Sequence, residues 1–253
     1  MNHLKTFQQY ASQLKLSTIG LQADQLFGQA QQEQPSYLEF ATQLLELEVQ
    51  QRQIKAQSRK LKAAQLPLQH QLEHFDCAAT EGISPAQLKQ LRELLWLDQN
   101  FNLIIMGPCG VGKTFLAAGL AYEAITKGYN ALFRTMQQVI DILKLKDITR
   151  SAKVQYRKII RADLLVIDDM MMFPVEKQDA TALFHLINQM HQQSSLIITT
   201  NKGPKEWTEL LDDQVLAAAM LDRLLFHCQI IRLAGESFRM TNRKSIFNKQ
   251  NES

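Results

Sequence analysis

The feature that most constrains this chain is the glycine-rich stretch at residues 107–114, Gly-Pro-Cys-Gly-Val-Gly-Lys-Thr. It follows the pattern G-x-x-x-x-G-K-T and lies between an apolar run that suits a buried strand, residues 102–106, and an Ala- and Leu-rich run that suits a helix, residues 115–127. Such a loop turns its backbone N–H groups inward at a helix N-terminus, where the helix dipole also favours negative charge. The stretch therefore predicts the phosphate-binding loop of an α/β nucleoside triphosphatase.

We expect the whole loop to line the nucleotide. Its residues are Gly107, Pro108, Cys109, Gly110, Val111, Gly112, Lys113 and Thr114. The Lys113 ammonium should reach the β- and γ-phosphates, and the Thr114 hydroxyl should be a ligand of Mg²⁺. The predicted cofactors are therefore ATP and Mg²⁺.

Two carboxylates, Asp168 and Asp169, directly follow four apolar residues at 164–167. At the end of a strand, Asp168 would hold Mg²⁺ through its water shell, and Asp169 would orient or deprotonate the attacking water. Apolar strands often end in Asp, so the pattern alone is weak. At about fifty residues after a complete phosphate loop it becomes a strong indication of ATP hydrolysis.

Strands and helices alternate through the second half of the chain. The candidate strands are residues 102–106, 131–135, 164–167, 196–200 and 229–233. This alternation is typical of a parallel α/β sheet. We therefore predict a five-stranded parallel sheet with the phosphate loop at the carboxyl end of its first strand.

Two polar residues of this half have two interpretations each. Asn201 ends the fourth strand, where its amide could bond the γ-phosphate or the attacking water, or could simply form the turn. Arg223 lies in a mostly apolar helix, where it could pair with Asp222 or Glu209, or reach a neighbouring subunit's nucleotide as an arginine finger. The residues alone leave Asn201 open and favour the ion pair for Arg223.

The first part of the chain is predicted to be a small helical domain, residues 1–75, followed by an ATPase domain, residues 76–253. Basic side chains recur at helical spacing near the end of the first domain: Arg52, Lys55, Arg59, Lys60 and Lys62. A second basic segment lies between the second and third strands, with Lys144, Lys146, Arg150, Lys153, Arg157, Lys158 and Arg161 against Asp141 and Asp147. Both stripes suit either a solvated surface or a surface that follows nucleic-acid phosphates.

The whole chain has a formal net charge of only +3, so the uneven distribution of charge is more informative than the total. No apolar run approaches the length of a membrane span, and the first residues lack the apolar core of a signal peptide. Three cysteines form no paired framework. We therefore expect a cytoplasmic protein without a membrane partner.

Together these motifs resemble the IstB-like helper ATPases of bacterial transposition and, through them, the DnaC-type helicase loaders of the AAA+ class. The resemblance covers nearly the whole chain. It rests on the basic helix end at residues 59–64, the connector at 72–76, the phosphate loop, residues 164–169, residues 195–201 with Glu206-Trp207, residues 215–225, and Gly-Glu-Ser-Phe-Arg at 235–239. One departure is Cys109, where the family usually has proline.

The resemblance implies an AAA+ core without a full C-terminal lid. It implies that Asn201 is sensor 1, that Arg223 acts in trans as the arginine finger, and that Arg239 is sensor 2, acting in cis. The implied activity is Mg²⁺-dependent ATP hydrolysis by a homo-oligomer that assembles on double-stranded DNA and recruits a transposase. The alternative is a replicative helicase loader. The DNA contacts expected are Arg52, Lys55, Arg59, Lys60, Lys62, Lys144, Lys146, Arg150 and Lys153.

Overall fold

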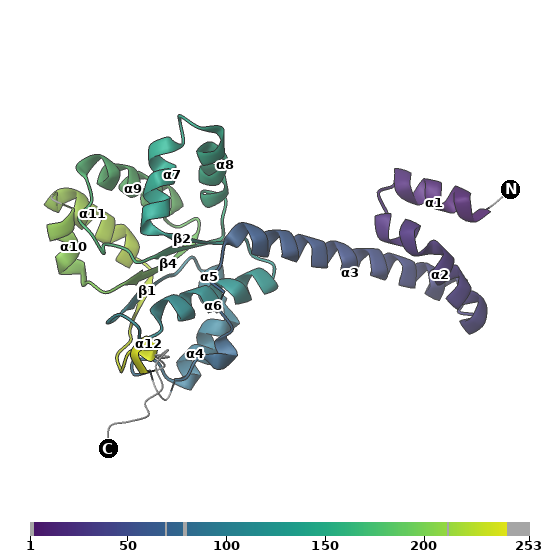
Figure 1. Ribbon diagram of the computed structural model, residues 1–253, viewed down its shortest axis with the longest axis horizontal. Coiled ribbons are helices and arrows are strands. Elements are labelled where there is room, and N and C mark those ends of the chain that lie inside the picture. Colours follow the sequence, from purple (N-terminus) through teal and green to yellow (C-terminus); the bar gives the residue numbers. More distant parts are fainter. Residues whose placement is uncertain (1–2, 69, 78–79, 212, 242–253) are drawn as a thin grey trace, which may run out of the picture. The chain divides into compact units, whose positions relative to one another are not determined.

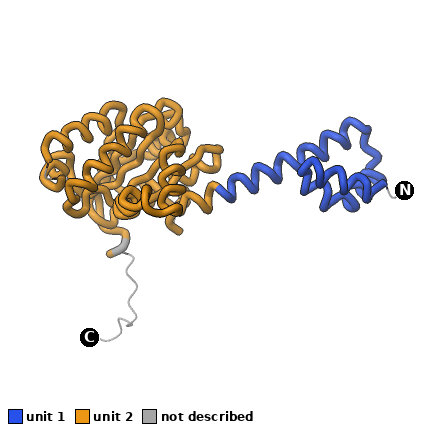
Figure 2. Tube along the Cα trace, turned by 90° about the horizontal axis from the view of Figure 1, so that it is seen from above, with its two compact units in different colours: residues 1–59 blue, residues 60–253 orange. Residues whose placement is uncertain are grey.

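The computed structural model describes residues 3–68, 70–77, 80–211 and 213–241. The chain forms two compact units, residues 1–59 and 60–253 (Figure 2). The boundary expected at residue 75 stays a prediction. The compact units divide earlier because the end of the third helix and the connector after it pack on the larger unit.

The smaller unit contains helices α1 (His3–Gln13), α2 (Ser17–Glu33) and most of α3 (Tyr37–Ala64). Its interior holds Glu48 of α3, whose carboxylate accepts from the Thr18 backbone N–H at 2.9 Å, in the first turn of α2. Arg52 pairs with Glu48 at 3.0 Å and donates to the Lys15 carbonyl at 2.7 Å. Burial alone would raise the pKa of Glu48, but the bonds from Arg52, Thr18 and Ile19 hold it below its usual value. Arg52 therefore has a structural partner inside this unit.

A buried arginine attaches the end of α3 to the larger unit. Arg134, on strand β2 (Ala131–Thr135), is 2% exposed and donates to the Ala64 carbonyl at 2.9 Å and the Ala63 carbonyl at 3.3 Å. These are the last carbonyls of α3, which have no partner within the helix. Burial lowers the pKa of Arg134. The contact explains why residues 60–64 belong with the sheet.

The larger unit is built on five parallel strands: β1 (Asn102–Met106), β2, β3 (Leu164–Asp168), β4 (Ser195–Thr200) and β5 (Cys228–Arg232). Their order across the sheet is β2-β3-β4-β1-β5, so the predicted five-stranded parallel sheet is confirmed. Strand β4 lies between β3 and β1. The carboxyl ends of the three strands that carry the predicted nucleotide residues therefore meet at one edge of the sheet.

Helices cover both faces of this sheet (Figure 1). Leu103 and Ile105 of β1 pack on the face with α4 (Pro85–Glu93) and α6 (Lys113–Thr126), whereas Ile104 packs on the opposite face. The opposite face carries α7 (Met136–Leu145), α9 (Lys177–Met190), α10 (Pro204–Leu210) and α11 (Gln214–Leu225). Helix α8 (Arg150–Ile159) packs beside α7. The alternation of strand side chains thus produces a three-layer α/β/α sandwich.

The remaining helices are short: a 3₁₀ turn η1 (Leu72–His74), α5 (Leu95–Asp98) and α12 (Phe238–Thr241). Ser84 and Gln87 form a capping box at the start of α4, with Pro85 in its first turn. Ser36 and Glu39 exchange the same pair of bonds at the start of α3, at 3.3 and 2.8 Å. Both helices therefore begin with a reciprocal pair of side-chain caps.

Candidate nucleotide site

The phosphate loop follows β1 and is held by backbone contacts on two sides. Gly107 donates to the Thr200 carbonyl of β4 at 3.3 Å, and the Leu233 N–H donates to the Met106 carbonyl at 2.7 Å. Gly110 has φ +87°, and a Cβ there would lie 2.0 Å from Ser237 Oγ. The glycine at this position is therefore required both by the backbone conformation and by the close approach of the segment after β5.

Lys113 begins α6 and is only 7% exposed. Its ammonium donates to the Gly107 carbonyl at 2.8 Å and the Pro108 carbonyl at 2.7 Å. The cation is thus held within the loop, at a helix N-terminus that also favours anions. Positive charge therefore lies within the loop, at the place where the motif predicts phosphates.

The carboxylate of Asp168 lies against two hydroxyls. Thr114 Oγ1 donates to Asp168 Oδ1 at 3.0 Å, and Thr199 Oγ1 donates to the same oxygen at 2.5 Å. Burial, helped by the nearby Asp169, raises the pKa of Asp168 although the two hydroxyls and Lys113 act in the opposite direction. A hydroxyl and a carboxylate side by side are the oxygen ligands that Mg²⁺ takes from proteins, so these residues fit that ion.

Asp169 directly follows β3 in a left-handed conformation, with φ 56°. Its backbone N–H donates to Thr199 Oγ1 at 2.9 Å, and its side chain is exposed. Thr199 therefore fixes both the carboxylate of Asp168 and the backbone of Asp169. Thr199 is not predicted from the sequence, because its bond to Asp168 depends on the pairing of β3 with β4.

Asn201 and Arg239 approach the loop from other elements. Asn201 follows β4 at the edge shared by β1 and β3, and it is exposed. The Phe238 N–H donates to the Gly110 carbonyl at 3.1 Å, which brings the backbone of α12 to the loop. The side chain of Arg239 lies outside the part that the structure describes. Residues 242–253 lie outside it as well, and the expected lack of a full C-terminal lid concerns these residues.

Arg223 lies on α11 and contacts α9. Its Nε donates to Asn188 Oδ1 at 2.6 Å, its Nη1 donates to the Ala219 carbonyl at 2.9 Å, and its guanidinium stacks 4.8 Å from the centre of the Phe184 ring. Among the described residues no carboxylate forms an ion pair with it. This half-buried arginine therefore has no ion-pair partner in the part of the chain that the structure describes.

The connector before α4 lies along the loop helix α6. A Cβ at Gly119 of α6 would lie 2.3 Å from the Leu72 side chain, and Phe75 stacks on Phe115 with 6.1 Å between ring centres. A Cβ at Gly112 of the loop would lie 3.2 Å from the Phe75 ring. The connector thus follows α6 from its middle to the phosphate loop.

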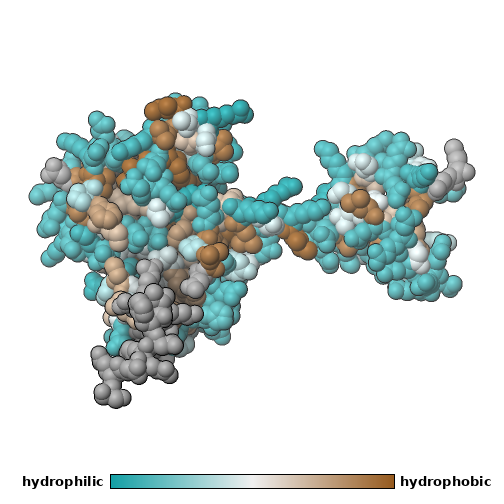
Figure 3. Space-filling model, in the orientation of Figure 1, coloured by the Kyte–Doolittle hydropathy of each residue, from teal (hydrophilic) through white to brown (hydrophobic). Residues whose placement is uncertain are grey.

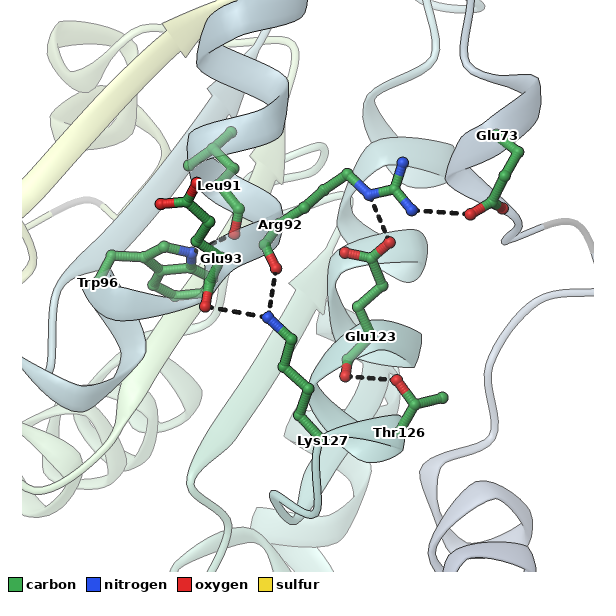
Figure 4. Close-up of polar contacts among 8 residues, drawn as sticks. All are labelled: Glu73, Leu91, Arg92, Glu93, Trp96, Glu123, Thr126 and Lys127. Carbon is green, nitrogen blue, oxygen red and sulfur yellow. Dashed lines mark hydrogen bonds and ion pairs between the residues drawn. The ribbon is translucent and has the colours of Figure 1, made fainter.

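An ion-pair cluster holds this arrangement (Figure 4). Arg92 of α4 bonds Glu123 of α6 at 2.6 Å and Glu73 of η1 at 2.7 Å. Lys127, at the end of α6, donates to the Arg92 carbonyl at 2.8 Å and the Glu93 carbonyl at 3.1 Å. Burial raises the pKa of Glu123 even beside Arg92. Helix α4, the connector and the loop helix are therefore tied at one point.

The basic residues of the second stripe have different surroundings. Lys144 pairs with Asp179 at 2.8 Å, and Lys146 lies over the Tyr156 ring at 4.6 Å. The turn beside them carries apolar side chains, since Ile148 is 77% exposed, and Figure 3 shows hydrophobic surface there. In contrast Arg150 and Lys153 are exposed on α8.

The first stripe, near the end of α3, likewise contains both residues with partners in the structure and exposed residues. Arg52 is engaged inside the smaller unit, and Lys60 donates to the Gly128 carbonyl. The other expected DNA contacts of this stripe, Lys55, Arg59 and Lys62, are exposed. The role of both stripes in DNA binding stays a prediction.

A sequence profile described as IstB-like ATP binding protein matches residues 9–246. The chain belongs to this family. The IstB-like chain is 42% identical over 251 residues to an insertion sequence IS21-like ATP-binding protein of Bacteroides fragilis, covering 99% of this chain and 95% of that one. It is 33% identical over 234 residues to an insertion sequence IS21 ATP-binding protein of Pseudomonas aeruginosa, covering 92% and 88%.

Solved structures share the fold of this IstB-like chain. The match to DnaI has a TM-score of 0.55 at 17% identity and covers 66% of this chain and 92% of that one. The match to AMPPCP-bound DnaA from Aquifex aeolicus has a TM-score of 0.53 at 19% identity and covers 66% and 50%. The larger unit therefore has the AAA+ P-loop fold. Among the described residues, none of the helices combines the length and hydropathy that a bilayer span needs.

Proposed function

We propose that this IstB-like protein is a Mg²⁺-dependent ATPase that assists DNA transposition by assembling on duplex DNA and recruiting a transposase. The observation that carries the proposal is the meeting of Lys113, Thr114 and Asp168 at one edge of the sheet, within a loop whose three glycines all have positive φ. The insertion-sequence relatives supply the biological context.

Each residue of the site has one task in the proposed reaction. Lys113 and the loop N–H groups stabilise the charge of the β- and γ-phosphates. Thr114 and Asp168 hold Mg²⁺, which neutralises phosphate charge when it is bound. Asp169, exposed beside them, orients the attacking water and accepts its proton, and Asn201 bonds the γ-phosphate or that water without adding charge.

Arg223 completes the site of a neighbouring subunit. It lies at the surface of α11 without a carboxylate partner among the described residues, which supports a role outside its own chain. Arg239 acts on the nucleotide of its own chain, because α12 begins at the phosphate loop. Hydrolysis would then require an ATP-dependent homo-oligomer in the cytoplasm.

The alternative, replicative helicase loading, rests only on a shared fold. DnaI and the DnaC helicase loader are 17% and 18% identical to this chain. The relatives at 42% and 33% identity are named for insertion sequences, and they favour transposition.

The proposal is tested by mixing the protein with ATP, Mg²⁺ and duplex DNA, and measuring phosphate release, the mass of the assembly and capture of an insertion-sequence transposase. We expect hydrolysis, large assemblies with ATP but not ADP, and capture of transposase. Capture of a replicative helicase in place of transposase would support the alternative, and the absence of hydrolysis and assembly would refute both.

A further inference from the structure

The larger unit has a hollow of about 490 Å³ at the amino end of β2, the end of the sheet opposite to the phosphate loop. Its cationic side chains are Lys60 from α3 and Arg157, Lys158 and Arg161 from α8 and the turn after it. Leu132 and Val154 contribute to its floor. None of the described residues that line it is acidic or aromatic. The hollow therefore suits an anion.

Three of these cations have no acidic partner among the described residues. Arg157, Lys158 and Arg161 are exposed, and no described carboxylate forms an ion pair with them. The nearby Asp163 carboxylate instead accepts from the Asn130 backbone N–H at 2.7 Å. Lys144 and Lys146, from the same basic segment, are engaged by Asp179 and Tyr156. The charge available to a ligand is thus concentrated at the hollow.

The cations extend from the hollow along one side of α8. Arg150, Lys153 and Arg157 recur at spacings of three and four residues, so they share one face of α8, and Arg161 follows in the turn after the helix. The helical part of that row is about 10 Å long at the helical rise of 1.5 Å per residue. A duplex carries one negative charge per about 1.7 Å of its axis, so several phosphates face a row of this length.

We infer that this surface, the hollow with the row on α8, binds the phosphate backbone of double-stranded DNA. The inference rests on the proposed function and assigns its DNA contact to Arg157, Lys158 and Arg161. Arginine favours phosphate because its guanidinium donates two parallel hydrogen bonds. A protein-binding surface would be expected to offer aromatic anchors, and the lining has none among the described residues.

The test compares two triple variants in a salt titration of binding to a labelled random-sequence duplex, with ATP present. The surface variant carries Arg157→Gln, Lys158→Gln and Arg161→Gln. The control removes the same number of charges elsewhere, with Lys5→Gln, Lys89→Gln and Lys205→Gln, three exposed lysines outside both basic stripes. The ATP-induced rise in melting temperature checks that each protein is folded.

We expect the surface variant to bind at least about tenfold more weakly at 0.1 M salt and to lose up to about 2.7 from the slope of log K against log salt, at about 0.9 per phosphate contact. The slope of the control variant should change by less than the value of about one phosphate contact. Photo-crosslinking provides a second measurement in which no charge is removed. A photo-crosslinking residue at Val154 should capture DNA, whereas one at Val215 of α11 should not.

Three results would overturn the inference. In the first, the wild-type protein binds DNA, the surface variant has the same affinity and salt slope, and no crosslink forms at position 154. The surface is then not the DNA contact, although the proposed function stands. If the variant loses only transposase capture, the surface belongs to a protein partner. If wild type binds no duplex with ATP or ADP, the proposed function fails as well.

Discussion

The two ends of the central sheet differ in how their side chains are fixed. At the carboxyl ends of β1, β3 and β4, backbone conformation sets the positions of the phosphate loop and of Asp168, and the Thr114 and Thr199 hydroxyls then fix the Asp168 carboxylate. At the amino end of β2, the cations come from α3 and α8, and their availability depends on which acids lie near them.

This difference explains why one sequence motif predicts the geometry of a site and another predicts only its charge. A phosphate loop specifies a backbone conformation, so residue types at fixed spacing determine the geometry. A basic stripe specifies only charge. Lys144 and Arg157 belong to the same basic segment, yet of these two only Lys144 has a carboxylate partner among the described residues, Asp179 of α9.

The largest effect is expected at the carboxyl end. Lys113→Ala removes the one side-chain cation that donates within the loop, so ATP affinity should fall at least about a hundredfold, as for other charged pairs that lose a partner. Assembly should fail with it. Lys205→Ala, which removes an exposed lysine of α10, is the control and should bind ATP normally. Titration calorimetry measures both, and near-normal binding by the Lys113 variant would contradict the site.

Arg223→Ala should lower turnover by about 10³-fold or more if the guanidinium acts as an arginine finger, while ATP binding persists. Because Arg223 would serve a neighbour, mixing this variant with Lys113→Ala subunits should restore part of the activity. Turnover is measured across mixing ratios in mixtures shown to co-assemble. No recovery at any ratio would count against action in trans.

Asp169→Asn separates hydrolysis from binding at the same edge of the sheet. It keeps the Asp168–Thr114 pair but removes the proton acceptor, so turnover should fall by about 10²–10⁴-fold with little change in ATP affinity. Single-turnover hydrolysis and nucleotide binding are the measurements. The variant should accumulate as an ATP-bound assembly, and normal turnover would remove Asp169 from its assigned role.

The smallest effect is expected at the ion-pair cluster. Arg92→Met leaves the largely buried Glu123 carboxylate without its cation and should cost about 1 kcal/mol of stability, because solvent screens the partly exposed arginine. Glu73→Gln, on the exposed side, should have a smaller effect. Adding Glu123→Leu to Arg92→Met should recover stability. Denaturant unfolding checks the order, and equal losses for Glu73→Gln and Arg92→Met would show that burial of Glu123 does not matter.

The sequence was sufficient for the sheet because its strands are short apolar runs with clear ends. The predicted strands at 102–106 and 131–135 coincide with β1 and β2. It was insufficient for contacts between distant segments. Nothing local to Thr199 signals its bond to Asp168, and the spacing of Arg134 does not reveal that it caps α3, 70 residues earlier. Such partners are determined by the order of the strands and by helix packing.

We propose that ATP controls assembly of the protein on DNA. The most direct test is to measure the protein's affinity for a random-sequence duplex, with ATP and with ADP, across a range of salt concentrations. One subunit's cations should bind DNA only weakly, at about 10⁻⁴–10⁻⁶ M, whereas assembly repeats them along the duplex. The account predicts much tighter binding with ATP, a steep salt dependence and little dependence on sequence. Equal affinity with ATP and ADP would contradict it.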